Sequence, residues 1–213
     1  RKLRSWLTMI GIFIGIAAVV SLFSLGQGLQ TAITGQFATL SADTLTIQNA
    51  GTGFGPPGST SIKKLTEHDL EIIENINGVK IAVPRILRVT RVDYNNVASF
   101  EYVTDIPEEN NKREMIYESL NLKAEKGRLL SNNDKRKVVI GSSIAEGNQF
   151  DKKIEVGKNI IIQGEEFEVI GILKKAGSFQ INMVILILNN DVEDLLDIEN
   201  EIDLIIVRGS IGY

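Results

Sequence analysis

Few side chains in this 213-residue chain could do chemistry, and the most reactive of them is a lone histidine. His68 stands between Glu67 and Asp69 in the first turn of an expected helix. A metal ion needs several donors that converge on it, and the i+4 position of that helical face holds Ile72. We therefore expect His68 to lie on the solvated surface, and we predict no metal site.

Carboxylates and hydroxyls offer two further kinds of chemistry. The pairs at 108–109 and 165–166 are adjacent glutamates near turns, which is typical of solvated charge and not of an acid and a base held across a substrate. Residues 141–143, Gly-Ser-Ser, join an expected strand to an expected helix, where backbone amides could hold an anion. No basic partner or general base stands nearby. Nucleotide-binding and nucleophile motifs are also missing, so we predict no cofactor.

The charge pattern excludes another class of partner. The net charge is −4 at pH 7, and the basic residues are scattered among acidic ones. A nucleic-acid backbone would find no basic stripe to bind. We therefore predict no binding of nucleic acid.

Residues 7–25, near the start of the sequence, form an apolar run without a charged residue. As a helix it would cross a hydrocarbon core of roughly 30 Å. Its leucine, isoleucine, phenylalanine and valine side chains favour the bilayer by roughly 5 kcal/mol. A cleaved signal peptide has a shorter apolar region, and a soluble core helix rarely needs this length. We predict a membrane anchor, with a signal peptide cut near residue 25 as the alternative.

Three basic residues set the expected orientation of the anchor. Arg1, Lys2 and Arg4 precede the apolar run, and no charge follows it until Asp43. The basic end of a membrane helix stays in the cytoplasm as a rule. We expect a cytoplasmic N terminus, contact with membrane lipid, and an extracytoplasmic location for the residues after about 30.

Two features of the anchor bear on mechanism. Gly11 and Gly15 form a G-x-x-x-G pair, which lets a second helix approach closely and makes them candidates for helix packing. Apolar residues then recur at helical intervals beyond the membrane segment, at Leu29, Ile33 and Phe37. We predict that the anchor continues outward as a stalk over residues 1–41, the alternative being a separate helix packed on the following domain.

Residues 42–213 predict a mixed α+β domain. Thr66 and Asp69 form a helix-capping pair, and Asn95-Asn96 and Gly164 mark hairpin turns between β-rich runs. Pro84 indicates an edge strand or a break. Strands and short helices alternate without a strict βαβ period, so the predicted class is α+β.

These residues carry a family resemblance. The opening segment resembles the first membrane helix of MacB-like ABC transporter permeases of the FtsX superfamily, in the pattern R-x-x-L-T-x-x-G-I-x-I-G-x-A-A. The pattern is filled by Arg4, Leu7, Thr8, Gly11, Ile12, Ile14, Gly15, Ala17 and Ala18. The stretches GRLLSNNDKRKVVIGSSIAEGNQF and VGKNIIIQGEEFEVIGIL are similar to the periplasmic core domain of that family.

The resemblance implies a non-catalytic permease subunit that dimerises and pairs with a cytoplasmic ATP-hydrolysing ABC subunit. It also implies mechanical transmission of ATP hydrolysis to extracytoplasmic substrate handling or export. Relatives carry further membrane helices after this domain, so we expect a fragment of a longer protein. Two alternatives are a single-pass anchored binding or sensor domain, and an exported enzyme freed from a signal peptide.

Overall fold

The computed structural model describes residues 2–37, 44–48 and 64–209. The chain divides into two compact units, Arg1–Ala38 and Thr39–Tyr213. The first unit holds one helix, α1, over Lys2–Phe37. This helix runs without a break past the apolar segment.

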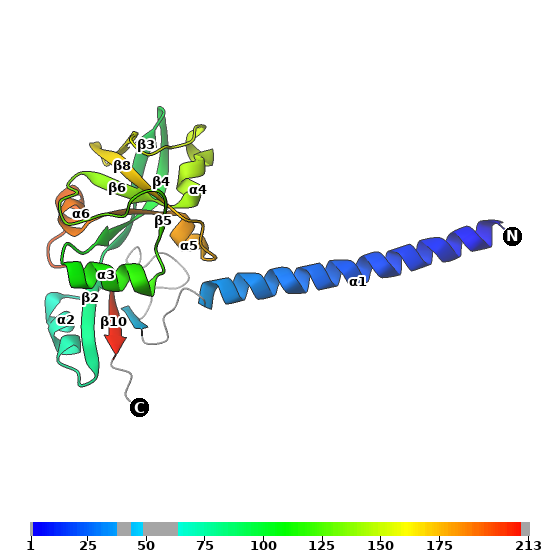
Figure 1. The fold of residues 1–213 in the computed structure, drawn as a ribbon, viewed down its shortest axis with the longest axis horizontal. Helices are drawn as coiled ribbons and strands as arrows, with labels where there is room; N and C mark the ends of the chain where they lie inside the picture. Colours follow the sequence, from blue (N-terminus) through cyan, green and yellow to red (C-terminus); the bar gives the residue numbers. More distant parts are fainter. Residues whose placement is uncertain (1, 38–43, 49–63, 210–213) are drawn as a thin grey trace. The chain divides into compact units, whose positions relative to one another are not determined.

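The second unit is built from short helices and strands (Figure 1). Its helices are α2 Glu67–Glu74, α3 Asn110–Ser119, α4 Ser142–Glu146, α5 Phe179–Asn182 and α6 Asn189–Leu196, with a 3-10 turn at Asn148–Phe150. Its strands are β1 Thr44–Gln48, β2 Val79–Arg85, β3 Leu87–Tyr94, β4 Val97–Ile106, β5 Ala124–Gly127, β6 Lys137–Ile140, β7 Asn159–Ile162, β8 Glu165–Leu173, β9 Val184–Leu188 and β10 Leu204–Gly209. The predicted α+β class is confirmed.

Seven strands form a sheet that closes on itself. The order is β5-β8-β6-β9-β4-β3-β7, and β7 pairs again with β8. Only two residue pairs of β3 and β7 complete the ring, Val92 with Ile162 and Asp93 with Ile161. The result is a small barrel in which β5 extends from β8 outside the ring.

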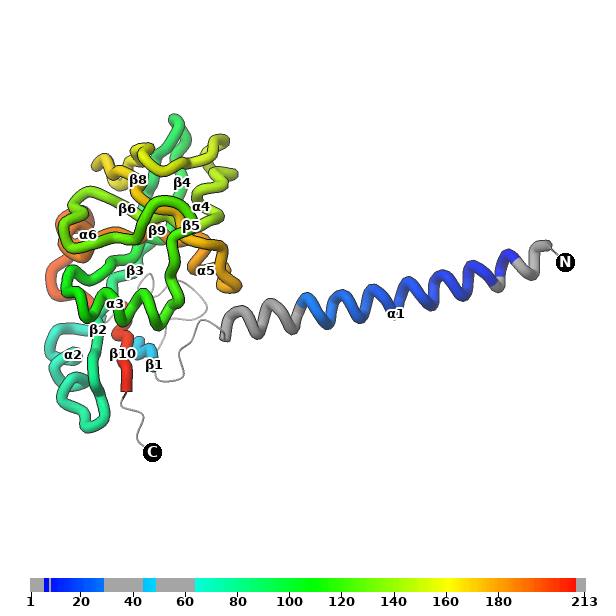
Figure 2. The backbone as a smooth tube through the Cα atoms, in the orientation of Figure 1, coloured from blue at the N-terminus to red at the C-terminus, as the bar shows by residue number. Residues whose placement is uncertain are grey.

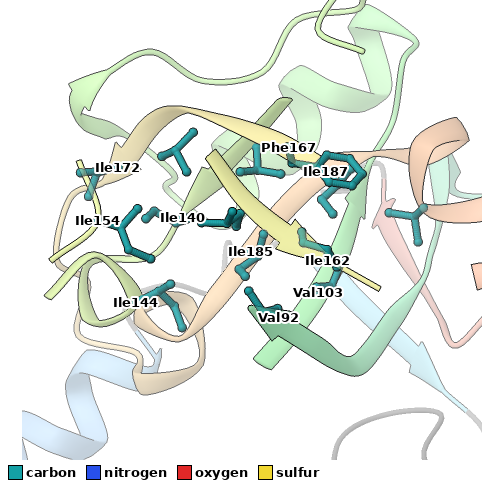
Figure 3. Close-up of a cluster of buried hydrophobic side chains, with 14 of the residues drawn as sticks. Val92, Val103, Ile140, Ile144, Ile154, Ile162, Phe167, Ile172, Ile185 and Ile187 are labelled. Atoms are coloured by element: carbon teal, nitrogen blue, oxygen red, sulfur yellow. The ribbon is translucent and has the colours of Figure 1, made fainter. Parts of the chain in front are cut away.

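The barrel interior is filled by aliphatic side chains and by Phe150 and Phe167. Side chains alternate along each strand, so Ile185 and Ile187 of β9 point inward while Leu186 points outward. Figure 3 shows the inward set, including Val92, Val103, Ile140 and Ile162, converging from different strands.

A second, three-stranded sheet has the order β1-β10-β2 and is antiparallel throughout. Helix α2 covers one face through Ile73, which is buried with Ala82, Ile205 and Val207. The predicted capping pair is confirmed, since the Thr66 amide donates to Asp69 Oδ2 at 2.9 Å. Pro84 lies in β2, which is an edge strand, so that prediction is also confirmed.

Helix α3 lies between the two sheets (Figure 1). Met115 and Ile116 are buried in one cluster with Val83 and Ile206 of the three-stranded sheet and with Leu186 of the barrel wall. Part of the outward face of the barrel is therefore covered by α3 and by the three-stranded sheet. This packing joins the two sheets into one hydrophobic unit.

Both predicted hairpins are present. Asn95 and Asn96 have φ of 53° and 62° between β3 and β4, the left-handed values that a tight two-residue hairpin turn needs. Gln163 and Gly164, with φ of 50° and 88°, make the corresponding turn between β7 and β8. These local turns fix the register of the strands on either side.

Candidate functional site

The predicted anchor is an apolar helix whose side chains are unburied. The segment Met9–Gly28 is long and apolar enough to cross a membrane, it is the one such helix among the described residues, and none of it is buried. Gly11 and Gly15 have nothing within 4 Å of where a Cβ would stand. Unburied apolar surface of this extent needs lipid or a partner helix around it.

Other predicted site residues fall on or beside this helix. Arg1 lies outside the described residues. The backbones of Lys2, Arg4, Leu29, Ile33 and Phe37 belong to α1, and their side chains lie outside the described part of the chain.

The residues considered for metal or anion binding are either exposed on the surface or hydrogen-bonded within the domain. His68 is 80% exposed, and its nearest charged partner is Glu71 at 3.9 Å. No group of three possible metal ligands occurs among the residues that the structure describes. Ser142 donates through Oγ to Asn182 Oδ1 at 3.0 Å, and the Gly141 amide donates to the Val184 carbonyl at 2.8 Å. The Ser142 hydroxyl and the Gly141 amide are thus engaged in hydrogen bonds within the domain.

The most unusual polar group lies where β2 passes into β3, at the joint between the two sheets. Arg85 Nε donates to Asp105 Oδ1 at 2.9 Å, and both side chains are almost fully buried. The same carboxylate oxygen accepts the Ile86 amide at 2.7 Å, and Arg85 Nη2 donates to Thr104 Oγ1 at 3.0 Å. A buried ion pair is tolerated only when further hydrogen bonds satisfy it in this way.

A second carboxylate extends this joint to β10. Asp203 Oδ2 accepts the Leu87 amide at 2.9 Å, and Oδ1 accepts from Lys64 Nζ at 3.1 Å. Arg88 pairs with the same carboxylate, and its Nη2 donates to Glu201 Oε2 at 2.8 Å. Burial lowers the pKa of both Lys64 and Arg88 from the ordinary values, and Glu201 opposes this shift.

We call the group Lys64, Arg85, Arg88, Asp105, Glu201 and Asp203 the ionic joint. It links β2 and β10 of the three-stranded sheet to β3 and β4 of the barrel. The sequence analysis did not predict this cluster. The available signal was an arginine and an aspartate within otherwise apolar strands, since charged residues in such positions are buried only when they are paired. The role of the ionic joint is structural, because it holds the three-stranded sheet against the barrel.

A buried carboxylate in the barrel wall has no such arginine. Glu101 is 3% exposed and its Oε1 accepts a hydrogen bond from Ser99 Oγ at 2.7 Å. Burial raises its pKa, and the Ser99 hydrogen bond only partly opposes this. The fold therefore favours the protonated form of Glu101.

We expect Glu101 to make stability fall as pH rises. Its folded pKa lies above its unfolded pKa, so no penalty exists below the unfolded value and the full penalty exists above the folded value. Glu101→Gln should remove this pH dependence and make the protein more stable than the wild type at neutral pH. Denaturant unfolding at a series of pH values measures this. The exposed-site control Glu168→Gln should keep the wild-type slope, and an unchanged slope in Glu101→Gln would contradict the prediction.

A tight turn at the end of β5 is formed by Gly127 and Arg128, which open the stretch GRLLSNNDKRKVVIGSSIAEGNQF. Gly127 has φ of +69°, and a Cβ there would lie 2.0 Å from the Ile170 carbonyl oxygen of β8. Arg128 pairs with Asp134, whose Oδ2 also accepts the Ser131 amide at 2.8 Å. Hydrogen bonds from Arg128 hold the pKa of Asp134 well below its usual range despite its burial. These residues therefore build a turn.

Comparison with known proteins assigns the chain to a family. A family model described as MacB-like periplasmic core domain matches residues 5–208. The chain belongs to this family. The MacB-like core domain is a component of ABC transporter permeases, as the names of its relatives state.

Two relatives illustrate the likeness. The chain is 36% identical over 197 residues to "Uncharacterized ABC transporter permease MJ1507" of Methanocaldococcus jannaschii, covering 92% of this chain and 47% of that protein. It is 33% identical over 177 residues to "Macrolide export ATP-binding/permease protein MacB" of Neisseria gonorrhoeae, covering 82% of this chain and 26% of that protein. The chain thus spans about half or a quarter of the length of these relatives.

Solved structures share the fold. The periplasmic region of MacB from Actinobacillus actinomycetemcomitans matches with a TM-score of 0.61 at 23% identity, over 83% of this chain and 78% of that one. The extracellular domain of the ABC-type transporter YknZ matches with a TM-score of 0.54 at 20% identity, over 78% of this chain and 82% of that one. The resemblance to MacB-like permeases that the sequence analysis stated is confirmed.

Proposed function

We propose that this chain is part of the membrane-spanning permease subunit of an ABC transporter. In this role it couples ATP hydrolysis by a partner subunit to substrate handling or export outside the cytoplasm. The observation that carries the proposal is one unbroken helix, α1, that contains the apolar segment and leads into a MacB-like core domain. A continuous helix resists bending, so it is suited to pass movement along its length.

The proposed topology follows from charge. Arg1, Lys2 and Arg4 at the near end favour a cytoplasmic N terminus. Residues 1–41 then form the membrane helix and stalk, and residues 42–213 form the extracytoplasmic domain. Leu29, Ile33 and Phe37 are the candidate stalk contacts.

The proposed partners are a cytoplasmic ABC ATPase subunit and a second permease copy. A relative named as both ATP-binding and permease protein supports the first. An uncovered apolar helix with two glycines one turn apart supports the second, since helices without side chains at the contact can approach closely.

We expect Gly15→Leu to weaken association of two such helices, because leucine would hold the backbones apart at Gly11 and Gly15. Crosslinking in membranes measures the association. Ala17→Leu is the matched control, since two residues along a helix turn the side chain about 200° away. Equal crosslinking in Gly15→Leu and the wild type would argue against packing on this face.

The function is tested in the full-length protein reconstituted with its ATP-hydrolysing partner. Thr31→Pro should break α1 beyond the apolar segment, because proline removes a helix hydrogen bond and clashes with the preceding turn, at a cost of about 3 kcal/mol. Thr31→Ala keeps the helix and serves as the control. We expect Thr31→Pro to keep ATP hydrolysis and lose its coupling to movement of the core domain. ATP-driven movement that is unchanged in Thr31→Pro would overturn the stalk role, and a wild-type complex without ATP hydrolysis would overturn the assignment as an ABC permease.

A further inference from the structure

The first and last strands that the structure describes, β1 and β10, lie side by side (Figure 2). Strand β1 follows α1 along the chain, and β10 is the last strand that the structure describes. They pair antiparallel over five residues, with Thr44 opposite Arg208 and Gln48 opposite Leu204. The beginning of β1 is thus beside the end of β10.

The end of α3 contacts both strands at this place. Arg208 Nη1 donates to Glu118 Oε2 at 3.2 Å, and Nη2 donates to Ser119 Oγ at 3.1 Å. The Thr44 and Ser119 hydroxyl oxygens are 3.4 Å apart. We call Thr44, Glu118, Ser119 and Arg208 the clasp.

The clasp is electrostatically favourable for α3. Carbonyl groups at the C-terminal end of a helix carry partial negative charge, and a cation near them stabilises the helix. The last turn of α3 has no basic residue of its own. Arg208 supplies that charge from β10, with its side chain 23% exposed, and Ser119 is 3% exposed. A partly buried charged hydrogen bond is worth more than one in open solvent.

Beyond the clasp, α3 reaches the barrel. Met115 and Ile116 are buried in one cluster with Val83 and Ile206 of the three-stranded sheet and with Leu186 of the barrel. A close-packed contact of this kind passes displacement on without first being compressed. Displacement of β1 and β10 is thereby passed through α3 to the barrel.

Strand β1 needs such a support. Among the strands that the structure describes, it pairs only with β10, at one edge of a three-stranded sheet. A strand with one partner is held by few hydrogen bonds and opens locally at low cost. A pull on the beginning of β1 acts first on Thr44, where the clasp lies.

We propose that the clasp is the device by which movement of α1 enters the core domain. It holds β1, β10 and the end of α3 together while α1 moves, so that the barrel follows β1 and β1 does not peel away. This rests on the proposed function, because the movement is the one that ATP hydrolysis drives.

The test uses the full-length protein with its ATPase partner. Arg208→Gln removes the charge and keeps most of the side-chain length, and Arg208→Lys keeps the charge. Arg136→Gln is the matched control, because Arg136 pairs with Glu165 on the exposed barrel surface. Amide hydrogen exchange in β1 and at the end of α3 should be about tenfold faster in Arg208→Gln, as the loss of one charged hydrogen bond predicts. We expect wild-type exchange in Arg136→Gln and most of the wild-type protection in Arg208→Lys.

Distances between spin labels at the exposed positions Thr46 and Glu168 provide the second measurement. With a non-hydrolysable ATP analogue, the wild type should keep one narrow distance distribution, since β1 and the barrel move together. Arg208→Gln should show a broader distribution that shifts when the analogue binds. Unchanged exchange or an unchanged distribution in Arg208→Gln would overturn the clasp.

A third label pair, at Ser24 in two copies, separates this outcome from failure of the proposed function. If the wild type shows no change there with the ATP analogue, α1 does not move and the proposed function itself is wrong. If that distance changes and Arg208→Gln behaves like the wild type, only the clasp is wrong.

Discussion

Asp105→Ala should lower the free energy of unfolding by about 3–5 kcal/mol, the usual cost of leaving one half of a buried ion pair without its partner. Arg85 would remain buried at the joint with its guanidinium uncompensated. The Ile86 amide would also lose its acceptor. Denaturant unfolding followed by amide exchange in β3 and β4 measures the loss, and those strands should show it most strongly.

Two further variants identify the cause. Asp93→Ala breaks the Arg91–Asp93 pair on the barrel surface, where Arg91 is 57% exposed, and should cost only about 0–1 kcal/mol. The double variant Arg85→Met, Asp105→Ala removes both charges and should recover part of the loss. If the double variant is as unstable as the two single losses added together, the ion pair is not the reason for the effect.

Gly127→Ala should destabilise the protein by at least about 3 kcal/mol, because two penalties coincide at this position. Its positive φ disfavours any residue with a Cβ. The added methyl group would also lie 2.0 Å from the Ile170 carbonyl oxygen, which belongs to the backbone and cannot rotate away. Strand β5 would have to separate from β8.

Gly157→Ala isolates the first penalty from the second. Gly157 has φ of +82°, and nothing lies within 4 Å of its added Cβ. Gly157→Ala should therefore lower the free energy of unfolding by only about 1–2 kcal/mol. Thermal unfolding of the two variants compares them directly, and equal losses would show that the close contact with β8 carries no weight.

Local signals accounted for the parts of the fold that the sequence predicts well. The Thr66 cap, the Asn95-Asn96 turn and the Gly164 turn each depend on residues within four positions of one another. The edge position of Pro84 likewise follows from its own missing amide hydrogen. Such features need no knowledge of the rest of the chain.

The ring of strands and the ionic joint depend on residues far apart in sequence. Val92 meets Ile162 to close the barrel, and Arg88 meets Asp203 across more than a hundred positions. No periodicity in one sequence specifies which distant strand is the partner. Charged residues inside apolar strands mark that some buried partner exists, but they do not say which one.

The pairing of Thr44 with Arg208 has a consequence for how such proteins are assembled from parts. Backbones of paired strands are roughly 5 Å apart, a gap that a two-residue turn can bridge. We therefore expect that residues 45–207 can be replaced by a short loop that joins Thr44 to Arg208, or inserted between two paired strands of another protein.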